Sequence, residues 1–538
     1  MEIQAQDLHH YGIISGICNE IELVDQINKL AGSNPQRKVS IGECTKAMII
    51  NGMGYTTRPL YLAHQFYETK PLCHLIKPDV DSSDFNDDAL GRTLDALYEK
   101  GCTTIFSHIA MNAAKQYGVD LKFRHFDTTN MQVYGEYADQ DQATQLINFG
   151  YAKHDRVDLK QFLISLMVSN DGGVPLLQYT VPGNTSDNAH FREVLKTMQH
   201  NIIGNEDPFY AVIDAAFYCE ESIQLGILWI TRVPDKIKLV GDLKNQFINR
   251  DHMEIIDDNY MFSEVCTWYG EVKQRWLIVY SKMAHERAKN SIMRQIKKER
   301  EEAEKALKKL HSNEYACAED AQKTITALSK KLSYHDVKIE AINERQSFVR
   351  AGRPTKESPL KISYCIETTL HEKSEENEQK ILLKSMFVLA TNELDYSKLS
   401  NKEILSYYKD QHKVESGFRF LKDPLCLASS VYLKKTERIV ALSMIMCLCL
   451  LVYSLAERKL RMALKQANET VPNQIGKGTQ TPTMRWVFQM FEGVIIAYIP
   501  TSKGIKQQII NLSEKLKKIL RLLGNHCMIM YLVEPQTQ

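Results

Sequence analysis

The first hundred or so residues place apolar side chains with the period of an amphipathic helix. Apolar positions recur at intervals of three and four in Glu22–Leu30 and in Ala89–Tyr98, ALGRTLDALY. Asn86, followed by two aspartates, stands just before the second segment, where a helix needs a capping side chain. We therefore expect a mostly helical N-terminal domain over residues 1–117.

From Val119 the pattern changes to short apolar runs that are typical of β-strands. Two of these runs flank the turn at residues 170–173, Asn-Asp-Gly-Gly, and predict a hairpin. The expected elements are strands at Leu121–Phe126, Phe162–Val168, Val174–Thr180 and Pro208–Ile213, with a helix at Asn188–His200. The first and last strands lead directly into Asp127 and Asp214. Strands mixed with helices predict an α/β fold, whose first part we place at residues 118–232.

Residues 233–395 interrupt this order and predict an insertion. Met261–Tyr280 contains two β-rich runs, CTWYGEV and RWLIVYS, and Ser385–Ala390 is a further expected strand. Ala284–Ala341 is highly charged, with apolar residues at helical spacing on both sides of Asn313. Two amphipathic helices folded back on each other fit this pattern. We therefore expect a β-rich insertion that carries a charged helical arm.

The longest apolar run, Ile439–Ala456, contains 18 residues without a charge. This length is near the lower limit for a membrane span. A single short span late in a charged chain is less expected than a helix buried in a large core, so we predict a core helix. It belongs to the second part of the α/β core, residues 396–470, and a C-terminal helical region, 471–538, follows it.

Charge and cysteine content bear on the binding partners and the cellular compartment of the protein. Residues 1–100 hold 9 Lys and Arg against 14 Asp and Glu, a balance of −5, whereas residues 401–538 hold 20 against 10, a balance of +10. The basic last quarter is a candidate for phosphate contacts, and a merely solvated basic face is the alternative. The 12 cysteines lack a C-x-x-C pair and no signal peptide is visible, which favours reduced thiols in a cytoplasm.

An expected helix at Asn401–Leu421 carries an unusual polar face. Five polar residues follow one another at steps of three, four, four and three: Tyr408, Gln411, Glu415, Arg419 and Lys422. This spacing places all five on one face of a continuous α-helix. A carboxylate between an amide, a phenol and cations does not resemble a core stripe, and the neighbouring Phe418 and Phe420 do not suit a solvated face.

Three carboxylates, Asp127, Asp214 and Glu415, suit metal-dependent cleavage of a phosphodiester. In-line attack requires an activated oxygen nucleophile and a stabilised leaving oxygen, and two divalent cations about 4 Å apart supply both. Magnesium prefers hard oxygen ligands, so carboxylates from two strands and a helix are a suitable ligand set. Lys and Arg donors nearby would hold the phosphates of a DNA strand.

These residues resemble a known family, the insertion-sequence DDE transposases with a Tyr-x2-Arg-x3-Glu-x6-Lys signature. Tyr408, Glu415 and Lys422 match three of its four positions with the spacing intact, whereas Gln411 replaces the usual Arg and removes a charge. Arg419, one turn further, is positioned to compensate. Other similar stretches are RHFDTTNM, GNTSDN, YAVIDAAFY, FNDDALGRTLDALYEKG and, with changes at His154, Asp155 and Val157, YAKHDRVDLKQ.

The resemblance runs from about residue 10 to about residue 500 and implies an RNase H-like catalytic core. It implies that Asp127, Asp214 and Glu415 hold two Mg²⁺ ions, for which Mn²⁺ can substitute. It further implies that Tyr408 and Lys422, with Gln411 and Arg419 beside them, contact double-stranded DNA at transposon ends and target, in a bacterial, nucleoid-associated homodimer.

Some relatives stack a flipped base on an insertion tryptophan. Trp276 and Trp268 are the candidates for this role, and a core tryptophan of the insertion is the alternative. Whether DNA cleavage passes through a hairpin intermediate stays open.

Three functions remain to be weighed. Transposition, with cleavage at element ends and strand transfer, is the leading one and of the cut-and-paste type. An RNase H-like nuclease or resolvase would use the same acids without strand transfer. A non-enzymatic coiled-coil or membrane-tethered adaptor would rely on residues 284–341 and 439–456, but it leaves the polar face at 408–422 unexplained. Gln411 also leaves an inactive copy as an alternative.

Overall fold

The computed structural model divides the chain into two compact units. It describes residues 3–32, 36–55, 62–137, 145–150, 158–202, 208–348, 360–423, 433, 435–502 and 504–534. Unit 1 comprises residues 1–231, 270–272 and 397–538, and unit 2 comprises 232–269 and 273–396. The insertion expected at 233–395 and unit 2 cover nearly the same residues, whereas the other four expected segments fold together into unit 1.

A mixed sheet forms the centre of unit 1, which confirms the expected α/β fold. Its strands lie in the order β4-β3-β2-β5-β6, with β2, β3 and β4 antiparallel and β5 and β6 parallel to β2. The strands are β2 (Phe123–Val133), β3 (Lys160–Ser169), β4 (Pro175–Pro182), β5 (Tyr210–Ile213) and β6 (Leu228–Val233). The expected hairpin turn joins β3 to β4, because Gly172 and Gly173 supply φ values of +82° and +63° that other residues rarely adopt.

Helices cover both faces of this sheet. On one face, Phe191 of α8 (Asp187–Ile202) packs against Phe126, with ring centroids 4.8 Å apart. The opposite face is covered by helices from the end of the chain, among them α14 (Asn401–Lys409), α15 (His412–Leu421) and α16 (Thr436–Gln466). Two short helical elements, η3 (Ala215–Phe217) and α9 (Glu220–Ile223), follow β5.

The N-terminal and C-terminal segments share one hydrophobic core with the sheet, so the expected N-terminal domain is not packed as a separate body. Its helices are α1 (Tyr11–Glu20), α2 (Leu23–Ala31), α3 (Ile41–Gly52), α4 (Ala63–Tyr67), α5 (Leu72–Leu75), η2 (Ser82–Phe85), α6 (Asp87–Glu99) and α7 (Cys102–Gln116). The cap expected for α6 is present, since the Asn86 side chain accepts a hydrogen bond of 2.9 Å from Ala89 N–H.

The C-terminal region is mixed, which corrects the expectation of a helical one. It contains β13 (Val471–Pro472), β14 (Gly478–Thr479), α17 (Met484–Met490), β15 (Ile495–Thr501), β16 (Gly504–Ile510), α18 (Glu514–Leu523) and α19 (Asn525–Met530). β15 pairs with β16 on one side and with β1 (Gln4–Asp7) on the other. Pairing between the two ends of the chain is a long-range contact that local periodicity does not reveal.

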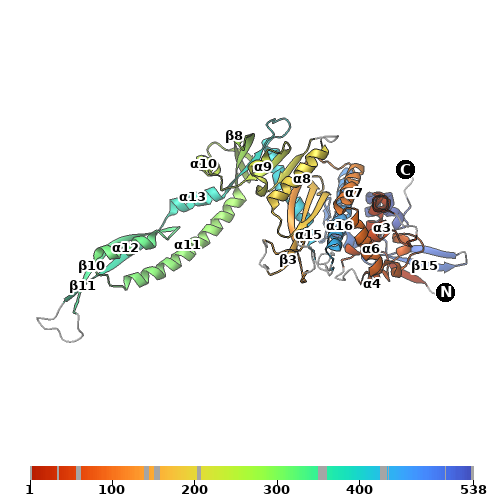
Figure 1. Ribbon diagram of the computed structural model, residues 1–538, viewed down its shortest axis with the longest axis horizontal. Helices are drawn as coiled ribbons and strands as arrows, with labels where there is room; N and C mark the ends of the chain where they lie inside the picture. Colours follow the sequence, from red (N-terminus) through yellow and green to blue (C-terminus); the bar gives the residue numbers. More distant parts are fainter. Residues whose placement is uncertain are drawn as a thin grey trace. The chain divides into compact units, whose positions relative to one another are not determined.

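The apolar helix α16 lies inside unit 1, which confirms the predicted core helix. It packs against α3, α6 and α7 (Figure 1). Among the described residues it is the one helix long and apolar enough to cross a membrane, and 89% of its most apolar window is buried by the protein itself. Burial against other side chains explains its hydropathy without a bilayer.

Unit 2 contains strands in the order β12-β9-β8-β7 and a separate arm. The strands are β7 (Glu254–Asp257), β8 (Tyr260–Tyr269), β9 (Val272–Ser281) and β12 (Met386–Thr391), and α10 (Lys238–Gln246) and α13 (Ser374–Lys384) accompany them. β8, β9 and β12 confirm the strands expected in Met261–Tyr280 and Ser385–Ala390. Trp276 lies within β9.

We call α11 (Lys282–His311), α12 (Ala318–Ser329) and the antiparallel hairpin of β10 (His335–Phe348) and β11 (Leu360–Glu372) the arm (Figure 1). The predicted second helix was wrong beyond Ser329. Val337, Ile339 and Ile342 instead face the two helices from β10, and a bulge after Ile339 had hidden their strand alternation.

Candidate active site

Asp127 and Asp214 lie at the same level of two adjacent parallel strands. The pairing of β2 with β5 ends at Phe126↔Ile213, and each aspartate directly follows a residue of this last pair. Register partners in a sheet point to the same face, and neighbouring strands are about 4.8 Å apart. The expected strand end at Phe126 was wrong, because β2 continues through Asp127 to Val133, whereas β5 does end before Asp214 as expected.

Both aspartates are half-buried and fixed by backbone contacts. Asp127 Oδ1 accepts a hydrogen bond of 2.7 Å from Thr128 N–H. Asp214 Oδ1 accepts one of 2.9 Å from Ala216 N–H and so caps the short helix η3. Thr231 Oγ1 on β6 donates to the Asp214 carbonyl oxygen at 2.8 Å, which ties the end of β5 to its neighbour. Backbone N–H groups therefore orient both carboxylates.

The helix that carries Glu415 is broken, which corrects the expectation of one continuous helix from Asn401 to Leu421. α14 ends at Lys409 and α15 begins at His412. The turn between them is tightened by bonds over three residues, from Gln411 N–H to Tyr408 O at 3.2 Å and from Lys413 N–H to Asp410 O at 2.9 Å. Of the five residues of the expected polar face, only Glu415, Arg419 and the C-cap Lys422 therefore share one face of a single helix.

α15 lies on the sheet face to which Asp127 points. A Cβ atom on Gly417 would stand 3.4 Å from Leu166 Cδ2 and 3.1 Å from Leu450 Cδ2, so the helix backbone is close to both side chains. Leu166 is the register partner of Asp127 on β3, and its side chain therefore shares the face of Asp127. Glu415, two residues before Gly417, is exposed on this helix. Its side chain can change rotamer without repacking the core.

A polar link joins the strand of Asp127 to the helix of Glu415. His125 Nε2 and Lys413 Nζ both donate to Asn170 Oδ1, at 2.9 and 3.0 Å, and Lys413 Nζ also reaches Asp410 Oδ2 at 2.8 Å. Burial lowers the pKa of His125 to about 4, so its imidazole is neutral at pH 7. His125 and Lys413 each stand two residues before a candidate acid, so the link sets α15 against β2.

Further along α15, Lys422 Nζ donates to Asn130 Oδ1 of β2 at 3.2 Å. Asn130 Nδ2 in turn donates to Gln161 Oε1 on β3 at 3.1 Å. The bonds of Lys413 and Lys422 thus fix both ends of α15 along β2, and Glu415 lies on the stretch of helix between them. The Lys422 amine therefore lies at Asn130 of β2, three residues after Asp127 on that strand.

The remaining predicted contact residues differ in exposure. Tyr408 and Gln411 are half-buried, and Arg419 is exposed with its Nη2 donating to Ser416 Oγ at 2.8 Å. Trp276 is fully buried in unit 2, and its Nε1 donates to Gln274 Oε1 at 2.9 Å. Such a ring could stack on a base only after leaving the core, so the burial favours the alternative of a core tryptophan. Trp268, in contrast, is 66% exposed.

Within the ranges that the structure describes, no three His, Cys, Asp or Glu side chains are grouped closely enough to hold a metal ion. The structure brings Asp127 and Asp214 to one level and Glu415 to the same face, but it does not gather the three carboxylates into one cluster. The donor chemistry fits a hard divalent cation, since all three are carboxylates. Glu415 is exposed, so its side chain has room to rotate.

Sequence reasoning missed His125, Asn170 and Lys413. Asn170 had been interpreted only as part of a turn, and Lys413 lies off the polar face of an ideal helix. The signal that could have found them is the equal offset of His125 and Lys413 from Asp127 and Glu415. The positions His154, Asp155 and Val157 lie outside the described residues.

Comparison with known protein families shows to which family the chain belongs. A protein-family model described as "Transposase DDE domain" matches residues 122–452, which is more than half of the chain. The chain belongs to the DDE transposase family. The protein is therefore a DNA transposase, an enzyme of a family that uses divalent metal ions. A second model, described as "Domain of unknown function (DUF4277)", matches residues 3–111 of the transposase.

Other comparisons add less about the transposase. A search of curated proteins finds no match. Among solved structures, a piggyBac transposase synaptic complex with hairpin DNA is similar at 8% sequence identity and a TM-score of 0.37. That match covers 91% of this chain and 82% of the other. At this TM-score the likeness does not define the details of the site.

Proposed function

We propose that the transposase cleaves DNA at the ends of its own insertion sequence and joins the freed ends to target DNA, by cut and paste. Asp127, Asp214 and Glu415 would hold two Mg²⁺ ions for both steps. The observation that carries this proposal is the shared level of Asp127 and Asp214 on the sheet face covered by the helix of Glu415. Carboxylates from two strands and a helix are the ligand set that the chemistry needs.

The bound ions would activate the attacking oxygen and stabilise the leaving one. In cleavage, a water oxygen forms a bond to phosphorus, the bond from phosphorus to the 3′ oxygen breaks, and the 3′ end leaves as a hydroxyl. In strand transfer, that 3′-hydroxyl attacks a target phosphodiester and a target 3′ oxygen leaves. The protein contributes orientation of the DNA, because phosphate contacts position a strand without reading its sequence.

We assign these phosphate contacts to Tyr408, Lys422 and Arg419. Lys422, the C-cap of α15, bonds to Asn130 of β2, and Arg419 is an exposed cation of the same helix. Gln411, at the tightened turn before α15, would hydrogen-bond a phosphate as a neutral donor. Two copies are proposed to act together, since two element ends have to be joined, on double-stranded DNA of the ends and of the target.

A cleavage and joining assay tests this proposal. Purified transposase is incubated with Mg²⁺, labelled duplexes of the element ends and a target plasmid. We expect nicked ends and joined product from the wild type, and neither from Asp127→Ala, Asp214→Ala or Glu415→Ala, with binding of the ends retained. Glu99→Gln, which changes an exposed glutamate at the end of α6, serves as the matched control and should stay active.

Each other outcome has a definite meaning. Cleavage retained in the three alanine variants would overturn the assignment of the acids. Cleavage without joined product would support the nuclease alternative. If the wild type binds but does not cut, and Gln411→Arg restores cutting, the copy is inactive through that one position.

A further inference from the structure

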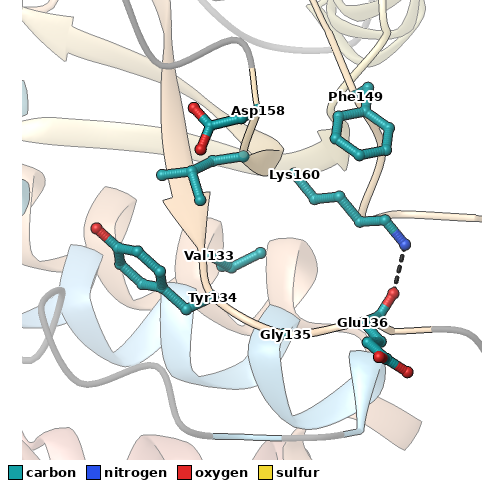
Figure 2. Close-up of a pocket in the computed structure, with 8 residues that line it drawn as sticks. Val133, Tyr134, Gly135, Glu136, Phe149, Asp158 and Lys160 are labelled. Atoms are coloured by element: carbon teal, nitrogen blue, oxygen red, sulfur yellow. Dashed lines mark hydrogen bonds between the residues drawn. The ribbon is translucent and has the colours of Figure 1, made fainter.

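A pocket of about 430 Å³ opens where β2 ends and β3 begins. It lies in unit 1, and its wall starts at Val133, six residues beyond Asp127 on the same strand (Figure 2). Its lining includes two aromatic rings and three charged side chains: Tyr134, Phe149, Glu136, Asp158 and Lys160. We propose that this pocket holds one unstacked nucleobase of the bound DNA, an inference that rests on the proposed function.

Two aromatic rings are exposed at the pocket. Tyr134 is 73% exposed and Phe149 is 59% exposed, although large apolar rings are usually buried. Lys160 Nζ stands 5.8 Å from the centre of the Phe149 ring and donates a hydrogen bond to the Glu136 carbonyl oxygen (Figure 2). An exposed aromatic face beside a cation, as at Phe149, is a combination on which nucleic-acid bases stack.

Acidic side chains in the lining suit the amino edge of a base. Among the described residues that line the pocket, Glu136 and Asp158 are acidic and Lys160 is basic. Carboxylates accept hydrogen bonds from the exocyclic amino groups of cytosine and adenine. A planar, uncharged ring with an amino edge therefore suits the pocket.

The wall that carries Phe149 is built rigidly. Asn148 and Gln161 exchange backbone hydrogen bonds of 3.0 and 2.8 Å, and Gln161 Nε2 donates to the Gly183 carbonyl oxygen at 2.9 Å. A Cβ atom on Gly150 would stand only 2.0 Å from that same oxygen, so glycine is required there. Rigid support of this kind lowers the entropy that binding would otherwise cost.

The pocket is continuous with the candidate active site along β2. Asp127 comes first, Asn130 with its bond to Lys422 follows, and Val133 opens the pocket. Six residues of strand span about 20 Å, which is the rise of roughly six base pairs of duplex DNA. A duplex held at Asp127 that follows this strand would place a base at the pocket about six positions from the cleaved bond.

Photo-cross-linking tests this inference. Duplexes of the element end carry 5-iodouracil at one position at a time, are bound to the full-length transposase and irradiated, and the linked peptides are mapped. We expect a cross-link to Tyr134 or Phe149 from one position, or two adjacent ones, about six from the cleavage point. Phe149→Ala with Tyr134→Ala should abolish it and weaken end binding about tenfold, since stacking on an aromatic ring is removed.

The controls separate this inference from the proposed function. Tyr98→Ala removes an exposed tyrosine of α6 outside the pocket and should change neither the cross-link nor the binding. Phe149→Tyr should restore what Phe149→Ala removes. End binding with cross-links elsewhere but none at Tyr134 or Phe149 would overturn the pocket as a base site, whereas a wild type that binds no element end would overturn the proposed function itself.

Discussion

Unit 1 and the arm of unit 2 are held together in different ways. In unit 1, side chains from Leu8 to Tyr531 join one hydrophobic cluster, so segments from both ends of the chain pack on the sheet. The arm has a small cluster of its own, made by buried Leu307, Ala321, Ile325 and Ile366. Among the described residues, this cluster joins the two helices to the hairpin that follows them, and it includes no residue from either end of the chain.

This difference bears on where an active site can be built. Asp127 and Glu415 are far apart in sequence, and only a core with long-range contacts holds such residues in a fixed relation. The arm has no comparable support, so we expect it to open without disturbing the acids.

The largest effect is expected from truncation of the two cores. Leu451→Ala removes a fully buried side chain of α16 and should lower the free energy of unfolding of unit 1 by about 2–5 kcal/mol. Ile325→Ala in α12 should instead speed hydrogen exchange in the arm alone. Mass spectrometry of hydrogen exchange separates the two, and loss of protection in unit 1 in the second variant would contradict the contrast.

Lys413→Met should impair catalysis without impairing stability to the same degree. It removes the donor that joins Asn170 to Asp410, so α15 loses one of its fixed points against β2. We expect kcat for end cleavage to fall about ten- to a hundredfold with KM little changed, because small misplacement of a catalytic group has such effects.

Two further variants control this result. Lys413→Arg should recover part of the rate, and Lys402→Met, at an exposed lysine of α14, should have no effect. A fall in DNA affinity with unchanged kcat would show that Lys413 binds DNA and does not position Glu415.

An acid-dependent effect is expected in the arm. The Glu299 carboxylate accepts bonds from Ser333 N–H, Tyr334 N–H and His335 Nδ1 at 2.7, 2.8 and 3.0 Å. Burial raises the pKa of Glu299, but these hydrogen bonds together lower it by more. The pKa therefore lies below the usual 4.5. Because the folded state depresses this pKa, the stabilisation is present above pH 4.5 and is lost as the pH falls through the folded value.

Glu299→Gln should therefore lower the free energy of local opening of the arm by about 1–2 kcal/mol. Hydrogen exchange of the arm should then be faster at pH 7. The difference between wild type and variant should shrink as the pH is lowered from 5 to 3, a pH interval around the usual carboxyl pKa. A difference that grows in acid would contradict the stated role of Glu299.

Gly417→Ala is expected to have the smallest effect on stability. Alanine favours a helix over glycine by about 1 kcal/mol, whereas its Cβ would press on Leu450 at 3.1 Å and cost about as much. The net change in the free energy of unfolding should be below about 0.5 kcal/mol. End cleavage should still slow measurably, since α15 has to shift slightly to relieve the contact with Leu450. An unchanged rate would mean that the helix position is less critical than proposed.

Local pattern was sufficient to predict much of the fold. The hairpin around residues 170–173, the cap of α6, the strand before Asp214 and the buried helix α16 all follow from short-range periodicity and turn chemistry. Three of the errors have other causes. The break before α15 depends on a tightened turn with a Lys413–Asp410 bond, β10 on a bulge, and the β1-β15-β16 sheet on pairing between chain ends.

The candidate site could be predicted from the sequence only in part, for the same reason. Asp127, Asp214 and Glu415 were named from strand ends and a helix face, but their common level and face depend on the pairing of β2 with β5 and on the contact of Gly417 with Leu166. The positioning residues His125, Asn170 and Lys413 come from three separate segments. Their meaning appears only when the sheet and α15 are placed together.

The central claim is that Asp127, Asp214 and Glu415 share bound metal, and iron-directed cleavage of the polypeptide tests it most directly. Fe²⁺ is added in place of Mg²⁺ to the transposase on its end DNA, ascorbate and peroxide generate radicals at the metal, and the cut sites are mapped. The account predicts cuts next to all three acids, suppressed by excess Mg²⁺ and lost together in Asp214→Asn. Cuts at other positions, or cuts near one acid that survive Asp214→Asn, would contradict it.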